Sequence, residues 1–567
     1  MELIVEHKAD LNHIIVGAAS ILAKCAREEE IEILKKKYGY IGSLPYEEKI
    51  WVKNDNLISF ENIGDIIENN QNNVKIFSLD NSKLNLINHN ITHGFKHKKM
   101  EIFQAYFNNG MVIELSANHP VFTLSSKGFL KPKRLYELES GSRIAFTSLN
   151  VNKKPIRYLD TFALLKNYST KKNSLYLKSE KIKSILKKMN LQKLKKILAK
   201  NTYNRTTLYQ WIKTSKLPLH MIEGIYKFRL QGYIISRKAK ECMIPTMLPI
   251  KKDFCWFLGI YLAEGCLIGE YKVDIANRDA FIIEKITKFL KKYKFGFVRT
   301  KNGVLIDSIL LNKLIRSLHL GNNARTKSIN PLFYNFSKEN INLLLKGIYD
   351  GDGYKDGNSQ EIEIYSKNLR DGIANLELLI GNLCSLRYRN KRNSFIARRL
   401  SKSTNSLSMD NIPSIIGVYL RNLRVKKNLS LREIERKHKI NRITLGLIEN
   451  QKVNLVSKKT LHKINKIYND GILNNLINSN LFWLKLVKII SKGSKEMVYD
   501  LEIKPNNLQN FVGNGGIVLH NSGYQTDQIT QKFVKENFDK YPEIFRKSWS
   551  TFKKHEIIKK QRKLNEF

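Results

Sequence analysis

Short apolar runs separated by Asn- and Gly-rich turns fill residues 43–150 of the chain. Apolar and polar residues alternate with a period close to two in the runs at 75–79, 102–107 and 111–115. A period of two, broken by turn residues, predicts β-strands and an all-β unit. We expect the closing strands of this unit at residues 480–521, near the other end of the chain.

The pattern changes from about residue 160, where apolar residues take a helical period and the chain becomes basic. Residues 191–198 form an amphipathic stretch, and residues 206–213 follow after a polar turn. Two helices joined by a short turn predict a helix-turn-helix motif. An ordinary basic helical hairpin is the alternative.

A second pair of helices is predicted further along the chain. Ser430 and Glu433 have the spacing of a capping box at the start of one helix. After a turn, residues 441–449 would form the recognition helix. This segment resembles the helix-turn-helix of phage repressors, and its Lys and Arg side chains would pair with DNA phosphates.

Two related apolar segments, 257–265 and 345–353, lie between these helical regions. Each carries two small residues four positions apart, followed by an acidic residue and a Gly that suits a helix C-cap. Small residues at this spacing let two helices approach closely, which would place Glu264 and Asp352 side by side. Adjacent carboxylates repel each other unless a cation lies between them, so the pair predicts a divalent metal site for Mg²⁺ or Mn²⁺. Such a site can clamp a phosphodiester during hydrolysis; a core helix repeated by chance is the alternative.

The net charge of the chain indicates a polyanionic partner. The 567 residues include 98 basic and 51 acidic ones, which gives +47. Hydrophobic residues make up 42% of the chain, enough for several packed cores, so a disordered polycation is excluded. Nearly all of the charge, +43, belongs to residues 43–521, whereas residues 1–42 carry −1 and residues 522–567 carry +5. Nucleic acid is therefore the expected partner of the central region.

Cysteine spacing and apolar runs narrow the class of protein further. The five Cys residues include no C-x-x-C pair, so neither a disulfide framework nor a zinc site is indicated. No apolar run approaches the ~18 residues of a membrane span, and the first residues lack a basic signal region. We expect an intracellular, cytoplasmic protein without a membrane partner.

The stretch that ends in His520, Asn521 and Ser522 has the residues of a self-cleaving junction. An Asn side-chain amide can attack its own backbone carbonyl, forming a succinimide and cutting the chain. A neighbouring His can protonate the leaving group, and a Ser hydroxyl can accept an acyl group. A plain strand that ends at an Asn-Ser turn is the alternative.

Three upstream segments match this ending. Ser43 follows Gly42, whose carbonyl is open to attack because Gly has no side chain. Ser116 and His119 lie three residues apart at the end of a strand-like run, and Asp500 lies in another such run. Taken in order, the four segments resemble the splicing blocks of inteins.

The resemblance spans residues 43–521 and implies a compact all-β splicing disc that needs no cofactor. Ser43 would attack the Gly42 carbonyl in an N-to-O acyl shift, assisted by Ser116 and His119. The acyl group would then pass to the hydroxyl that follows the C-terminal junction.

The same resemblance assigns the closing steps of splicing. Ser522 would take the acyl group by transesterification, and Asn521 would cyclise with help from His520. A spontaneous O-to-N shift would leave Gly42 bonded to Ser522. Asp500 would couple the steps.

The paired acidic segments resemble the motifs of LAGLIDADG homing endonucleases over residues 250–400. This resemblance implies two α/β half-domains that form a saddle over double-stranded DNA, and a target in the uninterrupted host gene. Glu264 stands where Asp is commoner. Lys327 matches the basic residue between the motifs, where it would neutralise phosphate charge or position water; a solvated surface Lys is the alternative.

The flanks of residues 43–521 resemble ribonuclease HII, which cuts the RNA strand of RNA–DNA hybrids with divalent ions. The resemblance is carried by Lys8-Ala9-Asp10, by the run at 18–24, by the Gly-Ser-Gly-Tyr made when Gly42 joins Ser522, and by residues 545–549. Asp10 falls on a metal-binding carboxylate of that family. The joined flanks would be a fragment that lacks the family's N-terminal half, and a separate chain would have to supply it.

The expected fold is multidomain: an all-β splicing (Hint) disc with an inserted α/β LAGLIDADG endonuclease and helix-turn-helix segments, flanked by an α/β ribonuclease H-like fragment. Two other functions stay open, namely a DNA-binding protein with degenerate catalytic centres and a module that cleaves itself without ligation. The expected domains are 1–42 (ribonuclease flank), 43–150 (splicing), 151–245 (helical DNA recognition), 246–405 (endonuclease), 406–478 (repressor-like helix-turn-helix), 479–521 (splicing) and 522–567 (ribonuclease flank).

Overall fold

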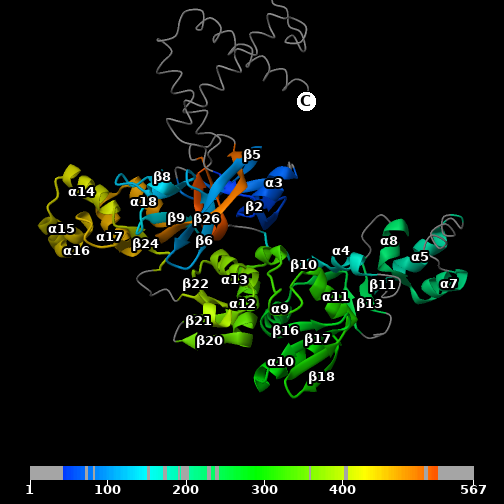
Figure 1. Ribbon diagram of the computed structural model, residues 1–567. Coiled ribbons are helices and arrows are strands. Elements are labelled where there is room, and N and C mark those ends of the chain that lie inside the picture. Colours follow the sequence, from blue (N-terminus) through cyan, green and yellow to red (C-terminus); the bar gives the residue numbers. More distant parts are fainter. Residues whose placement is uncertain are drawn as a thin grey trace, which may run out of the picture.

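The computed structural model describes residues 43–520. Within this range it leaves out 70–73, 81–82, 150–153, 170–174, 190–191, 193–203, 226–230, 237–241, 357–358, 401–406 and 504–508. Both flanks lie outside the described residues, and so do Asp10, Asn521 and Ser522. Figure 1 shows the arrangement of the described elements.

The two ends of the region fold together into one β-rich unit, as the alternating pattern predicts; it is called the splicing module here after the function that the sequence predicts. Two long strands, β5 (Leu86–Phe107) and β26 (Leu481–Ile503), pair antiparallel with several register shifts. They form the middle of an eight-stranded sheet in the order β1-β26-β5-β4-β2-β3, with β6 beside β5 and β9 beside β26. The remaining elements of this sheet are β1 (Leu44–Pro45), β2 (Lys49–Asn54), β3 (Leu57–Asn62), β4 (Val74–Leu79), β6 (Val112–Ser116) and β9 (Arg143–Thr147), with helix α3 (Ile63–Glu68) after β3.

A smaller sheet completes the module and carries its C-terminal strand. Its order is β27-β28-β7-β8, so a strand near the end of the region pairs with strands from its first third. Leu519 lies opposite Val121 in this pairing. The strands are β7 (Pro120–Leu124), β8 (Leu130–Arg134), β27 (Asn510–Val512) and β28 (Val518–His520).

The region after the first splicing strands differs from the predicted helical region, because it contains a sheet of its own. Short strands rich in Leu, Ile and Tyr pair in the order β12-β11-β13-β14. Helix 191–198 of the first predicted helix-turn-helix lies almost wholly outside the described residues, whereas its partner is α7, capped by the Asn204 side chain. The elements are β10 (Tyr158–Asp160), α4 (Thr161–Leu165), β11 (Leu175–Lys178), α5 (Glu180–Lys188), α7 (Arg205–Thr214), β12 (Lys216–Pro218), α8 (Leu219–Ile225), β13 (Tyr233–Ser236), β14 (Met243–Pro245) and β15 (Met247–Pro249).

Two α/β halves of similar construction follow. Each begins with a helix that ends in an acidic residue, followed by a four-stranded sheet in the order β16-β17-β19-β18 or β20-β21-β23-β22. The first half contains α9 (Lys252–Glu264), β16 (Gly265–Ile268), β17 (Lys272–Ala276), α10 (Ala280–Lys292), β18 (Gly296–Thr300), β19 (Gly303–Asp307) and α11 (Ile309–Ser317). The second contains α12 (Lys338–Asp352), β20 (Gly353–Asp356), β21 (Ser359–Ile364), α13 (Lys367–Ile380), β22 (Cys384–Arg389) and β23 (Ser394–Arg399).

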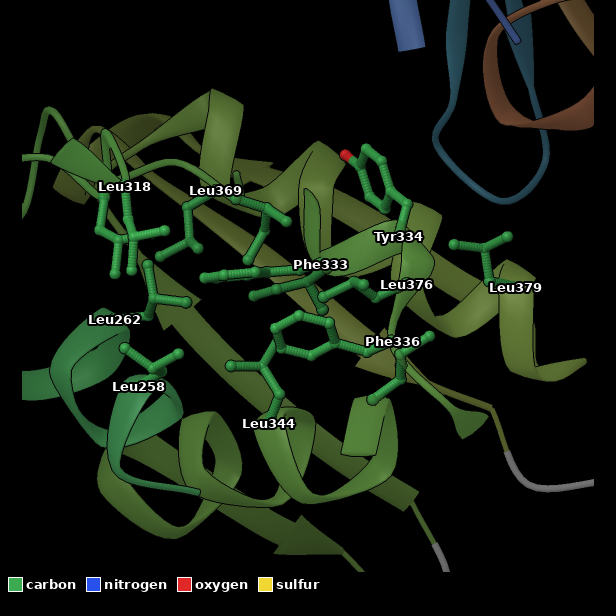
Figure 2. Close-up of a cluster of buried hydrophobic side chains, with 14 of the residues drawn as sticks. Leu258, Leu262, Leu318, Phe333, Tyr334, Phe336, Leu344, Leu369, Leu376 and Leu379 are labelled. Carbon is green, nitrogen blue, oxygen red and sulfur yellow. The ribbon is translucent and has the colours of Figure 1, made fainter. Parts of the chain in front are cut away.

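The core of these halves lies between α9, α12 and α13. Figure 2 shows Leu258 and Leu262 of α9 and Leu344 of α12 directed toward Phe333 and Leu376. All five side chains are fully buried or nearly so. Because both halves contribute to the same cluster, they form one packed unit.

The splicing module and the α/β halves also share a buried interface. The Asn335 side chain accepts a hydrogen bond from the Ile58 N–H at 2.7 Å and donates one to the Ile58 carbonyl at 2.8 Å. The rings of Trp51 and Tyr334 meet edge to face with centroids 5.2 Å apart. Asn109 accepts a backbone hydrogen bond from the Leu386 N–H at 2.6 Å. The α/β halves are therefore packed against the splicing module through buried contacts and are not joined to it by the chain alone.

A five-helix unit packs against another side of the splicing module, at the left in Figure 1. The predicted capping box is present, since the Ser430 and Glu433 side chains each accept from the other's backbone N–H. Two short helices joined by a turn are also present as predicted, here α15 and α16. The elements are β24 (Asn411–Pro413), α14 (Ile416–Lys426), α15 (Leu431–His438), α16 (Arg442–Glu449), β25 (Leu455–Ser457), α17 (Lys458–Tyr468) and α18 (Gly471–Asn478).

Within the described ranges, no helix combines the length and the apolarity that a membrane crossing requires.

Candidate functional site

Ser43 is buried against the end of β6. Its backbone N–H donates to Oγ of Ser116 at 2.9 Å, and the Ser116 N–H donates to the Ser43 carbonyl at 3.1 Å. Both residues are almost fully buried. No described residue hydrogen-bonds to Oγ of Ser43. The predicted nucleophile and its predicted hydroxyl partner are therefore in direct contact.

Asp500 lies across from Ser43 on the neighbouring strand. Leu44 pairs with Tyr499, so the antiparallel register puts Ser43 opposite Asp500. The Asp500 side chain is buried, and one of its oxygens accepts from the Leu501 N–H at 2.8 Å. Ser43 is thus flanked by β6 on one side and β26 on the other.

The two histidines lie at the smaller sheet, one directly before β7 and the other at the end of β28. His119 precedes β7, and its N–H donates to the Ser116 carbonyl at 3.0 Å. His520 ends β28, and its ring stacks on Phe122 with centroids 5.6 Å apart. Both rings are buried, and β7 pairs directly with β28. The structure therefore brings His119 and His520, predicted from distant segments, to adjacent strands.

Asn510 positions the strand that pairs with β28, and the sequence motifs did not reveal it. Its side chain accepts from the Leu79 N–H at 2.7 Å and donates to the Leu79 carbonyl at 3.0 Å. This pair of bonds fixes β27 against the end of β4. A polar residue at the start of an apolar strand was the only signal of this role.

A second site lies where α9 and α12 end. A Cβ placed on Gly259 would lie 2.1 Å from the Leu344 carbonyl oxygen, and one on Gly351 would lie 2.6 Å from Cβ of Ala263. These contacts advance in the same direction along both helices, so the helices run side by side and end together. The prediction of close packing through small residues is confirmed.

The two acidic residues face each other at these helix ends. Burial raises the pKa of Glu264 to about 7, and the neighbouring Asp352 carboxyl acts in the same direction. Burial also raises the pKa of Asp352, while the charge of Lys327 opposes that rise. The Asn277 side chain donates to Glu264 at 3.0 Å. Two carboxyl groups that are costly to ionise together suit a shared divalent cation, which would be held by Glu264 and Asp352.

The described residues offer no larger metal cluster, because no three His, Cys, Asp or Glu side chains among them come together in one place. A cation between the two carboxylates would therefore complete its shell with water and with oxygens of a substrate. That requirement fits a metal that works on a phosphate group, since Mg²⁺ commonly binds through one or two carboxylates plus substrate phosphates.

Lys327 is buried, so the alternative of a solvated surface lysine is wrong. Its ammonium group donates to the carbonyls of Tyr261 and Leu262, the second at 3.1 Å, in the last turn of α9. Burial lowers its pKa to about 7, against the attraction of Asp352 and Glu264. The lysine therefore lies beside the carboxyl pair and also satisfies carbonyls at the end of the helix that carries Glu264.

Comparison with known proteins identifies the family. A family model of the intein splicing domain matches residues 52–521. The chain belongs to the intein family. In this intein chain, a family model of ribonuclease HII also matches residues 1–44.

The relatives differ in how much of this chain they match. DNA-directed RNA polymerase subunit Rpo1C of Methanocaldococcus jannaschii is 30% identical over 331 residues, which cover 51% of this intein chain and 38% of that protein. Ribonuclease HII of Pyrococcus furiosus is 62% identical over 42 residues, 7% of this chain and 19% of that protein. The intein chain therefore matches less than two-fifths of each relative's length. A crystal structure of I-DmoI with DNA and Mn aligns with 27% of this chain and 90% of that chain, at 13% identity and a TM-score of 0.22.

Proposed function

We propose that residues 43–521 excise themselves and join Gly42 to Ser522. The observation that carries this proposal is the position of Ser43, whose N–H donates to Ser116 while its own Oγ accepts nothing from the described residues. The nitrogen of Ser43 belongs to the bond that would break. This nitrogen gains a proton as it leaves the carbonyl, and it already donates a hydrogen bond to Ser116 Oγ. His119, three residues on, serves as the acid–base group of this step.

The C-terminal steps follow from the end of β28. Asn521, directly after His520, would attack its own carbonyl with its side-chain nitrogen, closing a succinimide and releasing the amine of Ser522. His520, which precedes Asn521 in the chain, is 6% exposed and stacked on Phe122, so its ring is fixed at the end of β28. The ester formed on Ser522 then rearranges to an amide. Asp500, opposite Ser43, links the first step to the later ones.

The masses of the products test this proposal directly. Expression with a different tag at each end should give species of 479 and 88 residues from the 567-residue chain. The variant Asn521→Ala should stop release at the C-terminal junction and accumulate a branched or N-cleaved species. Ligated flanks from this variant would refute the mechanism. Two separate flank peptides without ligation would instead support the self-cleaving module.

We further propose that the α/β halves are a DNA endonuclease of the LAGLIDADG type. Support comes from two helices in backbone contact that place Glu264 and Asp352 together beside buried Lys327. Mg²⁺ or Mn²⁺ held by the two carboxylates would polarise the phosphodiester and lower the pKa of bound water. Lys327 keeps the end of α9, and with it Glu264, in place.

The expected substrate is double-stranded DNA of the host gene without the insertion. Codons for Gly42 and Ser522 abut only in that gene, so the insertion destroys its own target. Duplexes that carry the joined and the interrupted sequence should be compared with Mg²⁺ supplied, and only the joined one should be cut. Equal cutting of both, or cutting of neither, would leave a DNA-binding function alone.

The five-helix unit is proposed as an additional DNA contact. On α16, Arg442, Ile443 and Thr444 are exposed, while Leu445 and Ile448 on the opposite side are buried. Such a helix can reach base edges with its free face, and apolar side chains there can contact thymine methyl groups. Removal of this face by substitution should weaken binding without altering the products of splicing.

The flanks are proposed as a ribonuclease HII fragment that acts on RNA–DNA hybrids with Mg²⁺ or Mn²⁺ at Asp10. Support is confined to the sequence similarity of residues 1–44. Ribonuclease HII of Pyrococcus furiosus is matched over 19% of its length, so a separate chain that supplies further ribonuclease segments is the proposed partner. Hybrid cleavage by the spliced product, with and without that chain, is the test.

A further inference from the structure

Glu48 is a buried carboxyl group that the splicing steps above do not use. It lies in the tight turn between β1 and β2, five residues after Ser43, and is 7% exposed. Its N–H donates to the Pro45 carbonyl at 3.1 Å, and its own carbonyl accepts from the Ile63 N–H at 3.0 Å. Its backbone is therefore fixed, which aims the side chain into the module.

The carboxyl group of Glu48 contacts the strand that holds Ser116. One of its oxygens accepts a hydrogen bond from the Glu114 N–H at 3.1 Å. Glu114 lies on β6 two residues before Ser116, and the Ser43–Ser116 bonds join β6 to the residue that precedes β1. Glu48 therefore supplies the next bond to β6, in place of a longer strand.

The same carboxyl group also faces the turn that leads to β28. Asn514 begins this turn, and its side chain favours the ionised form of Glu48. Ile50, two residues after Glu48, bridges to Gly513 beside that turn. One side chain thus lies at the junction of the segments that carry Ser43, Ser116 and His520.

A strand of two residues determines its own register poorly, because few ladder bonds hold it. β1 spans only Leu44–Pro45, yet Ser43 must keep its nitrogen on Ser116 for the first step. We propose that Glu48 is a positioning residue for splicing, whose buried carboxyl group aligns Ser43 with Ser116 and ties both to the turn before β28. This inference rests on the proposed splicing function.

The protonation of Glu48 gives the alignment a pH dependence. Burial raises the pKa of its carboxyl group to about 8, and the Glu114 carboxylate adds to this rise. The hydrogen bond from the Glu114 N–H, the Asn514 side chain and the charge of Lys367 oppose it. An ionised carboxylate accepts hydrogen bonds more strongly than a neutral one. The bond to β6 should therefore tighten as pH rises through about 8, which should speed the first step.

The test uses the full chain with Asn521→Ala, so that release of the N-terminal flank by hydroxylamine, which requires the acyl shift at Ser43, is measured without Asn cyclisation. In this background Glu48→Ala should slow cleavage at least about ten-fold, because it loosens the alignment of Ser43. Glu48→Gln keeps an acceptor and should stay within about two-fold of the parent at pH 6. Glu47→Ala, the same change at the exposed neighbouring residue, is the matched control and should have no effect.

The pH profile separates positioning from a purely structural role. The ratio of parent to Glu48→Gln rates should rise across about pH 8, and the ratio of parent to Glu47→Ala should stay flat. A flat ratio for Glu48→Gln, or parental cleavage by Glu48→Ala, would overturn the inference while leaving splicing intact. If Glu48→Ala fails to fold, the Gln profile decides alone. Absence of cleavage in the Asn521→Ala parent would overturn the proposed splicing function, and this inference with it.

Discussion

Gly347 should be one of the least replaceable residues of the α/β halves. A Cβ at this position in α12 would lie 2.1 Å from the Trp256 carbonyl oxygen and 3.0 Å from Cα of Gly259. Both are backbone atoms of α9, so no side-chain rotation can relieve the clash. Gly347→Ala would have to push the two helices apart.

The sign of the effect distinguishes this position from an ordinary helical glycine. Gly→Ala inside a helix usually stabilises it by about 0.5–1 kcal/mol. Overpacking a buried contact costs about 1–3 kcal/mol, so we expect Gly347→Ala to lose about 1–2 kcal/mol overall. If the substitution moved the two helices apart by about 1 Å, it would also misplace Glu264 relative to Asp352 and slow DNA cleavage by about 100-fold.

The matched control is Gly446→Ala in α16. A Cβ there would find its nearest neighbour, Cδ1 of Leu431, at 3.7 Å, which is an ordinary contact. This variant should be neutral or more stable by up to about 1 kcal/mol. Denaturant unfolding and the DNA cleavage rate should be measured for both variants. Equal stability of the two, with cleavage intact in Gly347→Ala, would refute the packing argument.

Three further predictions concern charge and burial. Asp352→Asn should abolish DNA cutting but leave splicing unchanged, and DNA affinity should persist and fall steeply with salt, as a gel-shift titration would show. Asn335→Ala should cost about 2–4 kcal/mol, because it leaves both backbone groups of Ile58 buried without partners, and should lower the midpoint temperature of splicing and of DNA cleavage together. The raised pKa of Glu48 makes the folded state bind a proton that the unfolded chain has lost, so stability should fall by about 1.4 kcal/mol per unit as pH rises from 4.5 to about 8, and Glu48→Gln should not show this loss in pH-dependent unfolding.

Each of these predictions has its own control and its own contrary result. Splicing lost in Asp352→Asn would contradict the separation of the two chemistries. Asn342→Ala, which removes an exposed amide bonded within α12, should leave both temperatures unchanged. Identical pH profiles for the parent and Glu48→Gln would contradict the raised pKa of the buried carboxyl group.

The sequence by itself determined which residues are candidates for chemistry at the two junctions. Ser43 directly follows Gly42, and Asn521 lies between His520 and Ser522. Each motif is contiguous in the chain, so it can be recognised without knowledge of the fold. Helix periodicity and the spacing of small residues also predicted the close pairing of α9 and α12, because both are properties of one helix face. The capping box of Ser430 followed from a three-residue spacing in the same way.

Only the tertiary structure decided which polar side chains are buried, because burial depends on segments that meet from afar. Lys327 donates to the carbonyl of Tyr261, 66 residues earlier in the chain, and is buried there. From the sequence alone, a solvated surface lysine was an open alternative. Asn335 meets Ile58 across 277 residues, and Glu48 meets Glu114 across 66. No local pattern records such pairings, since a buried Asn or Glu has the same sequence neighbours as an exposed one. The small sheet β12-β11-β13-β14 escaped prediction for the same reason, because strands of three or four residues are specified by their distant partners more than by their own composition.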